Sequence, residues 1–78
     1  MDISIKDLKI GDKGRVSGFS KQGRVYRKRL LAMGLTPGTE FSIVRFAPLG
    51  DPIEITLRGF SLTLRKDEAD ILSIEKIA

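Results

Sequence analysis

The sequence has 78 residues, of which 41% are hydrophobic and 31% charged, and its net charge is +4. A chain of this length and composition forms one small folded domain, so we expect a single domain over residues 1–78. The sequence contains neither cysteine nor histidine. Disulfides and thiolate metal sites are therefore excluded, and both the commonest metal ligand and the commonest general base are missing. We expect a protein that is not an enzyme and that holds no metal and no cofactor.

Targeting and membrane-spanning patterns are absent from the sequence. The first residues, Met1-Asp2-Ile3-Ser4, carry an acid where a secretory signal would carry positive charge. The longest apolar run, Leu30-Leu31-Ala32-Met33, is far shorter than the ~18 residues that a spanning helix needs. These features predict a cytoplasmic protein that does not insert into a membrane.

The first predicted strand lies within residues 6–19 and follows a glycine-containing turn. Gly11 and Gly14 permit backbone angles that other residues resist, as a turn requires. In the short strand that follows, Val16 and the neighbourhood of Phe19 are expected to face inward.

The stretch from Arg24 to Met33 is predicted to be a helix. Tyr26, Leu30 and Met33 recur at positions i, i+4 and i+7 and therefore form one apolar stripe. No glycine or proline interrupts the run, which supports a continuous helix.

The residues after this stretch indicate how the helix ends. Gly34 stands where a left-handed C-cap residue belongs, and Leu35 can supply the hydrophobic contact of a Schellman ending. Residues 36–39 read Thr-Pro-Gly-Thr, which predicts a type II turn with proline at its second position and glycine at its third.

The remaining chain alternates between apolar and polar residues, as short strands do. The residues expected to face inward are Phe41, Ile43, Ile53, Ile55, Leu57, Leu62, Leu64 and Ile74. A tight turn is expected near Gly59 and a short helical turn around Asp67 to Asp70. Closure into a barrel would remove the exposed edges of such a sheet. We predict a mainly β fold, a small SH3-like or OB-like barrel of about five strands with one α-helix after the first strand.

Positive charge is concentrated in residues 13–45, which hold eight bases and one acid, whereas both flanking segments are mildly acidic. Five of these bases lie in or just before the predicted helix: Lys21, Arg24, Arg27, Lys28 and Arg29. Three interpretations remain open: contacts with nucleic-acid phosphates, docking on an acidic protein surface, or a solvated helix face. Most of the five aromatic residues fall on predicted core positions instead of an exposed stacking platform, so nucleic acid is not the expected partner.

The loop Ala47-Pro48-Leu49-Gly50-Asp51-Pro52 places an apolar side chain between two prolines. Prolines reduce the entropy that a loop loses on docking, which favours a recognition loop. The alternative is that Leu49 folds back to plug one end of the barrel, and the two interpretations are compatible.

Two further features of the sequence argue against nucleotide hydrolysis and nucleophilic catalysis. Asp67-Glu68-Ala69-Asp70 has the acidic motif of a helicase family, but no phosphate-binding glycine loop accompanies it. We interpret it as a polar first turn that places acids near a helix N-terminus. A nucleophile–base pair is not available either, because no serine or threonine has a histidine partner.

Three segments together resemble one family. Tyr26–Thr39, read Tyr-Arg-Lys-Arg-Leu-Leu-Ala-Met-Gly-Leu-Thr-Pro-Gly-Thr, is similar to the helix and turn of the FeoA family. Ala47–Pro52 resembles the family's next hallmark. Gly59–Lys66, followed by Glu68-Ala69 and Ile71, resembles its closing segment. The resemblance covers essentially the whole chain in the expected order.

The FeoA resemblance implies a cytosolic SH3-like ferrous iron transport protein A that assists the membrane transporter FeoB. FeoB carries a GTP-binding domain on its cytoplasmic side. We therefore expect an adaptor that docks on FeoB through the basic helix and the proline loop, with self-association left open. The candidate partner-binding residues are Arg24, Arg27, Lys28, Arg29, Leu31, Leu35, Pro48 and Leu49. Among them, Leu31, Leu35 and Leu49 are the candidate apolar anchors.

Two alternative functions are kept. The first is a regulator of the partner's GTP hydrolysis that inserts Arg24 or Arg27 into the nucleotide site, since an arginine supplied in trans can accelerate hydrolysis. The second is a small-barrel nucleic-acid-binding protein, whose affinity would fall steeply with salt.

Overall fold

The computed structural model describes residues 3–20, 24–49 and 51–77, and these residues form a mainly β fold. The elements in chain order are the 3-10 helix η1 (Ile5–Asp7), β1 (Lys13–Phe19), α1 (Arg24–Ala32), β2 (Glu40–Phe46), β3 (Ile53–Leu57), β4 (Phe60–Leu64), α2 (Lys66–Ile71) and β5 (Leu72–Lys76). The predicted helix after the first strand and the predicted short helical turn near Asp67 are both confirmed.

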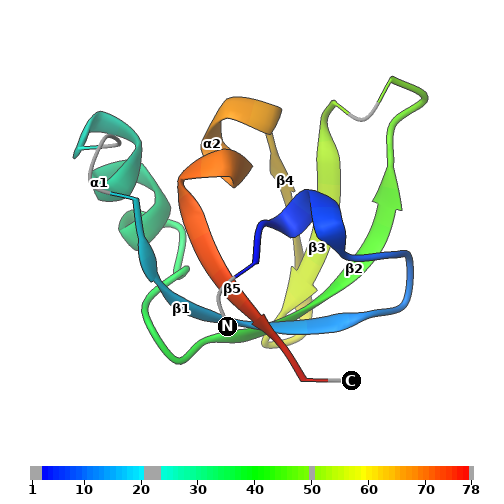
Figure 1. The fold of residues 1–78 in the computed structure, drawn as a ribbon, viewed down its shortest axis with the longest axis horizontal. Helices are drawn as coiled ribbons and strands as arrows, with labels where there is room; N and C mark the ends of the chain where they lie inside the picture. The colour runs from blue at the N-terminus through cyan, green and yellow to red at the C-terminus, as the bar shows by residue number, and fades with distance from the viewer. Residues whose placement is uncertain (1–2, 21–23, 50, 78) are drawn as a thin grey trace.

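The five strands form one antiparallel sheet in the order β4-β3-β2-β1-β5. The pairing shifts register after Val16 in β1 and after Ile43 in β2. Such bulges bend a strand and increase its twist. The sheet curls around its inner face, and α2 carries the chain from the edge strand β4 to the other edge strand β5 (Figure 1). This arrangement confirms the expected small SH3-like fold.

The inner face of the curled sheet holds the hydrophobic core. Of the residues predicted to face inward, Leu62 is partly buried and seven are fully buried, namely Phe41, Ile43, Ile53, Ile55, Leu57, Leu64 and Ile74. Val16 is also buried, and Phe19 packs against the core. Gly14 lies so close to this core that an added Cβ would come within 2.9 Å of Ile74 Cγ2 and of Phe41 Cζ. The glycine therefore permits the inner face to close tightly.

Helix α1 ends in the predicted Schellman motif. The Gly34 N–H donates to the Leu31 carbonyl at 3.1 Å, the Leu35 N–H donates to the Leu30 carbonyl at 3.0 Å, and Gly34 has φ +94°. Leu30 and Leu35 are both fully buried, which supplies the expected hydrophobic contact. Both the helix and its ending are therefore confirmed.

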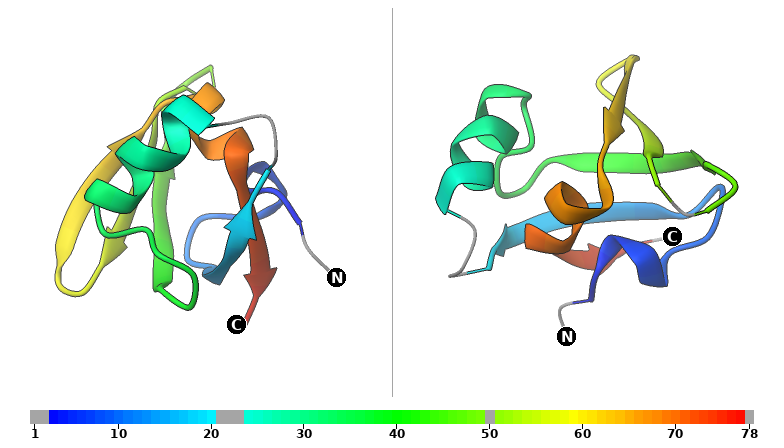
Figure 2. Two further views of the ribbon diagram at one scale, coloured as in Figure 1. Left: turned by 90° about the vertical axis from the view of Figure 1, so that its left-hand side faces the viewer. Right: turned by 90° about the horizontal axis from the view of Figure 1, so that it is seen from above.

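The turn after this ending is the predicted type II turn. Gly38 has φ +92°, and the Thr39 N–H donates to the Thr36 carbonyl at 3.0 Å. The turn returns the chain into β2, so that α1 lies beside the curled sheet and next to α2 (Figure 2).

Strands β3 and β4 form a hairpin with a two-residue turn. Arg58 has φ +51° and Gly59 has φ +86°, the combination that the type I′ turn requires. The tight turn expected near Gly59 is confirmed. It fixes the register of β4 and places Arg58 at the exposed tip.

Candidate partner-binding surface

The basic side chains of α1 face solvent. Arg24, Arg27, Lys28 and Arg29 are all exposed, and α1 contains no acidic residue, whereas Lys21 of the predicted basic cluster lies outside the described residues. Val25 is 83% exposed on the same helix. Tyr26 is also exposed, so the predicted apolar stripe is buried fully only at Leu30 and partly at Met33. The helix therefore presents a surface on which cations surround an apolar side chain.

Arg29 differs from its neighbours because it pairs with a buried carboxylate. Its Nε lies 3.1 Å from Glu68 Oε2, and the Glu68 side chain is only 4% exposed. The other carboxylate oxygen, Oε1, accepts a hydrogen bond from the Arg65 main-chain N–H at 2.9 Å and so caps the start of α2. Glu68 thus lies in the first turn of α2, as expected for the acidic pattern, and it also caps the helix. Arg29 joins α1 to α2 and is a structural residue as well as a candidate contact.

Arg27 is held by an aromatic ring. Its guanidinium carbon lies 5.6 Å from the centroid of the Phe19 ring on β1, within the range of a cation–π contact. The contact places the guanidinium over the end of β1 while the side chain remains exposed. Arg27 is therefore partly ordered before any partner binds.

The structure separates the three candidate apolar anchors. Leu35 is fully buried as part of the core, so the expectation that it contacts a partner is wrong for this conformation. The reason is the Schellman ending, which turns this side chain back against Leu30. Leu31 is partly buried, and Leu49 is 95% exposed. Leu49 is the most accessible of the three.

The proline loop is fixed at its base and exposed at its tip. The Ala47 N–H donates to the Pro52 carbonyl at 3.0 Å, and Asp51 Oδ1 accepts from the Lys66 N–H at 3.0 Å. Pro48 and Leu49 project from this anchored base into solvent. The interpretation that Leu49 plugs the barrel is wrong, because its side chain is almost fully exposed.

The helix and the loop approach each other at the beginning of α2. A cleft of about 400 Å³ lies there, lined by Arg29, Asp51, Pro52, Thr63, Arg65 and Glu68. Residues 22 positions apart in the sequence, Arg29 and Asp51, thus line one surface. A partner that covers this cleft would touch both candidate segments.

Leu49 also borders an apolar cleft of about 330 Å³. Its apolar lining comes from Ile5, Leu8, Phe46, Leu49, Ile53 and Ala69. Lys6, Lys66 and Asp70 supply the polar part of the lining. The cleft depends on packing between η1, the strands and α2, so the local sequence pattern gave no signal for it.

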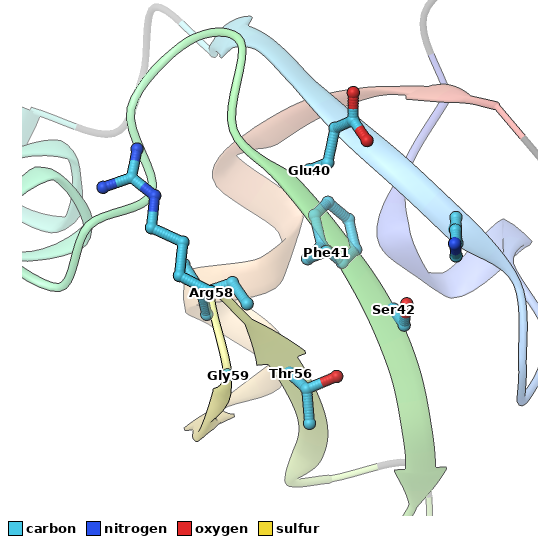
Figure 3. Close-up of a pocket in the computed structure, with 8 residues that line it drawn as sticks. Glu40, Phe41, Ser42, Thr56, Arg58 and Gly59 are labelled. Atoms are coloured by element: carbon cyan, nitrogen blue, oxygen red, sulfur yellow. The ribbon is translucent and has the colours of Figure 1, made fainter.

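The outer face of the sheet carries a larger, open hollow of about 450 Å³, lined by residues of β1, β2 and β3 and by the β3–β4 turn. Figure 3 shows Ser42 and Thr56 beside each other on β2 and β3, with Glu40 and Arg58 at one end. Glu40 is paired with Arg15 at 3.5 Å. The alternation of polar residues along β2 and β3 is the signal that could have located this hollow.

The described residues contain no cluster of three or more metal-ligating side chains. Across residues 3–20, 24–49 and 51–77, no helix is long and apolar enough to cross a membrane. Fold and surface together define a small SH3-like β domain that presents a basic helix beside an anchored proline loop.

Comparisons with known proteins place this domain in a family. The model of the FeoA domain matches residues 3–76. An FeoA-like protein from Clostridium acetobutylicum has 39% identity and a TM-score of 0.88, over 99% of this chain and 88% of that chain. The FeoA protein from Chlorobium tepidum has 38% identity and a TM-score of 0.82, over 97% of this chain and 71% of that chain. The chain belongs to the FeoA domain family.

A curated relative carries the same domain within a longer protein. The Fe(2+) transport protein A/Fe(2+) transporter FeoB fusion protein of Porphyromonas gingivalis is 31% identical over 76 residues, which are 97% of this chain. The chain spans 9% of the length of that relative.

Proposed function

We propose that this protein is a cytoplasmic accessory protein of ferrous iron uptake that docks on the membrane transporter FeoB. The observation that carries the proposal is the Porphyromonas gingivalis relative, in which an Fe(2+) transport protein A and FeoB form one chain. Fusion raises the effective concentration of two domains for each other, which benefits domains that bind one another.

The docking surface consists of α1 and the tip of the proline loop. Arg24, Arg27 and Lys28 provide long-range attraction to an acidic surface, which increases the association rate and sets orientation. Leu49 and Pro48 provide apolar contact on an anchored loop that loses little entropy on binding. Leu31 lies partly buried on α1 and belongs to the border of this surface.

The proposal is tested by co-purification with FeoB, using its cytoplasmic domain and its membrane part separately. The wild-type protein is expected to be retained by one of the two parts. Retention by neither part would contradict docking on FeoB.

Two further experiments test the two alternatives. If the protein regulates GTP hydrolysis, the turnover of the FeoB GTPase domain changes when it is added, and an unchanged rate removes that function. If it binds nucleic acid, DNA or RNA is retained at low salt, and no retention removes that function.

A further inference from the structure

Strand β4 has an uncovered edge. It pairs with β3 from Ile53↔Leu64 to Leu57↔Phe60, and no other segment of the described chain pairs with its outer side. The other edge strand differs. Ile3 and Ile74 exchange hydrogen bonds of 2.7 and 2.9 Å, which covers the outer side of β5 at that position.

The hairpin geometry determines which groups of β4 point outward. In a two-residue hairpin the residues flanking the turn, here Leu57 and Phe60, exchange both main-chain bonds, and bonded and non-bonded pairs then alternate. Phe60, Leu62 and Leu64 therefore direct their main-chain groups to β3. Ser61 and Thr63 direct theirs away from the sheet.

Proteins usually protect such an edge, and β4 lacks the usual protection. Phe60–Leu64 contains no charged residue, no proline and no register shift. Phe60 is 52% exposed on the same face as the buried Leu64. An edge of this kind is a template for an added strand, and Phe60 extends the apolar face that such a strand would cover.

The charges around the edge favour an acidic partner segment. Arg58 precedes β4, and Arg65 and Lys66 follow it. Thr63 and Arg65 also line the cleft at the start of α2 together with Arg29 of α1. The two acids of that cleft already have partners, since Glu68 pairs with Arg29 and Asp51 accepts from the Lys66 N–H.

A second copy of the chain fits the edge poorly. Antiparallel pairing of two β4 strands would bring the cationic ends of the two strands together, with Arg58 of one copy near Arg65 and Lys66 of the other. Like charges brought close together repel, which disfavours this pairing. The cations at both ends of β4 therefore favour an acidic segment of another protein over a second copy of this chain.

We propose that β4 binds an extended, acidic segment of a partner protein as an added sixth strand. Ser61 and Thr63 supply main-chain hydrogen bonds, Phe60 and Leu62 supply apolar contact, and Arg58 and Arg65 pair with acids that flank the added strand. The inference rests on the edge itself and not on the proposed docking to FeoB, so each can fail without the other.

The probe for this site is a synthetic peptide of alternating valine and threonine with glutamates at both ends, and its control has lysines in place of the glutamates. In the ¹⁵N-labelled protein, the glutamate peptide is expected to slow hydrogen exchange of the Ser61 and Thr63 amides. The lysine peptide is expected to bind at least about 10-fold more weakly at low salt.

Two proline variants with matched alanine controls test the main-chain bonds. Thr63→Pro removes an outward N–H without removing a hydrogen bond between β3 and β4, which an edge strand tolerates, whereas Thr63→Ala retains the N–H. Thr63→Pro is expected to weaken peptide binding at least about 10-fold, and Thr63→Ala by less than about 2-fold. Ser61→Pro and Ser61→Ala form the second pair if Thr63→Pro fails to fold.

Four results would overturn the proposal. The first is no binding of the glutamate peptide at about 1 mM. The second is equal binding by the proline and alanine variants. The third is binding that leaves both amides unprotected. The fourth is protection without peptide that rises with protein concentration, because it would identify the occupant as a second copy of the chain.

Discussion

Arg29 on α1 pairs with the buried Glu68 on α2 at 3.1 Å, and this contact links the basic helix to the body of the fold. Glu68 also caps α2 through its other carboxylate oxygen. One side chain therefore fixes both the beginning of α2 and the position of α1. The remaining cations of α1, Arg24, Arg27 and Lys28, are available to a partner without loss of this link.

Replacing Arg29 is expected to lower stability more than replacing its neighbour. Arg29→Ala leaves the Glu68 carboxylate buried and without its cation, which costs about 1–2 kcal/mol because the arginine is itself largely exposed and screened. Lys28→Ala, on the solvent side of the same helix, is expected to change the free energy of unfolding by less than about 0.5 kcal/mol. Urea denaturation of both variants measures the difference, and equal free energies would show that the pair contributes nothing.

Two glycines of β1 provide a test of core packing. Gly14→Ala places a methyl group 2.9 Å from Ile74 Cγ2 and Phe41 Cζ, and overpacking of this kind costs about 1–3 kcal/mol. Gly18→Ala meets no heavy atom within 4 Å and is expected to be neutral within about 0.5 kcal/mol. Thermal unfolding of the two variants checks the prediction. A Gly14→Ala variant as stable as Gly18→Ala would mean that the inner face is less tightly closed than described.

Two leucines that look similar in the sequence are expected to behave differently. Leu35→Ala removes a fully buried side chain and should cost about 2–5 kcal/mol. Leu49→Ala removes a side chain that is 95% exposed, so its stability should stay within about 0.5 kcal/mol of the wild type. Denaturation midpoints distinguish the two. If Leu49→Ala were strongly destabilised, the loop tip would pack against the domain after all.

The local sequence was sufficient to predict elements whose signals lie close together in the chain. The α1 ending and the type II turn depend on Gly34, Leu35 and Gly38, which are neighbours, and the strands depend on strict alternation. The core residues followed because alternation assigns each side chain to one face of the sheet.

Features that depend on contacts between distant segments could not be predicted. Arg29 meets Glu68 across 39 positions of sequence, and no local pattern announces that pair. The Leu35 error differs in origin, because the predicted Schellman ending already required this side chain to pack against Leu30, five residues away. The exposed edge of β4 became visible only when the strand order was known.

The central claim is that α1 docks on FeoB through its available cations. The most direct measurement compares the affinity of FeoB for the wild type, for Arg24→Glu/Lys28→Glu/Arg27→Glu, and for the control Lys6→Glu/Lys9→Glu/Lys13→Glu. The control changes the net charge equally with exposed lysines of η1, the following turn and the start of β1, and Arg29 is left in place to preserve the link to Glu68. We predict that the α1 variant binds at least about 10-fold more weakly than both the wild type and the control. Equal affinity of the α1 variant and the control would contradict docking through α1.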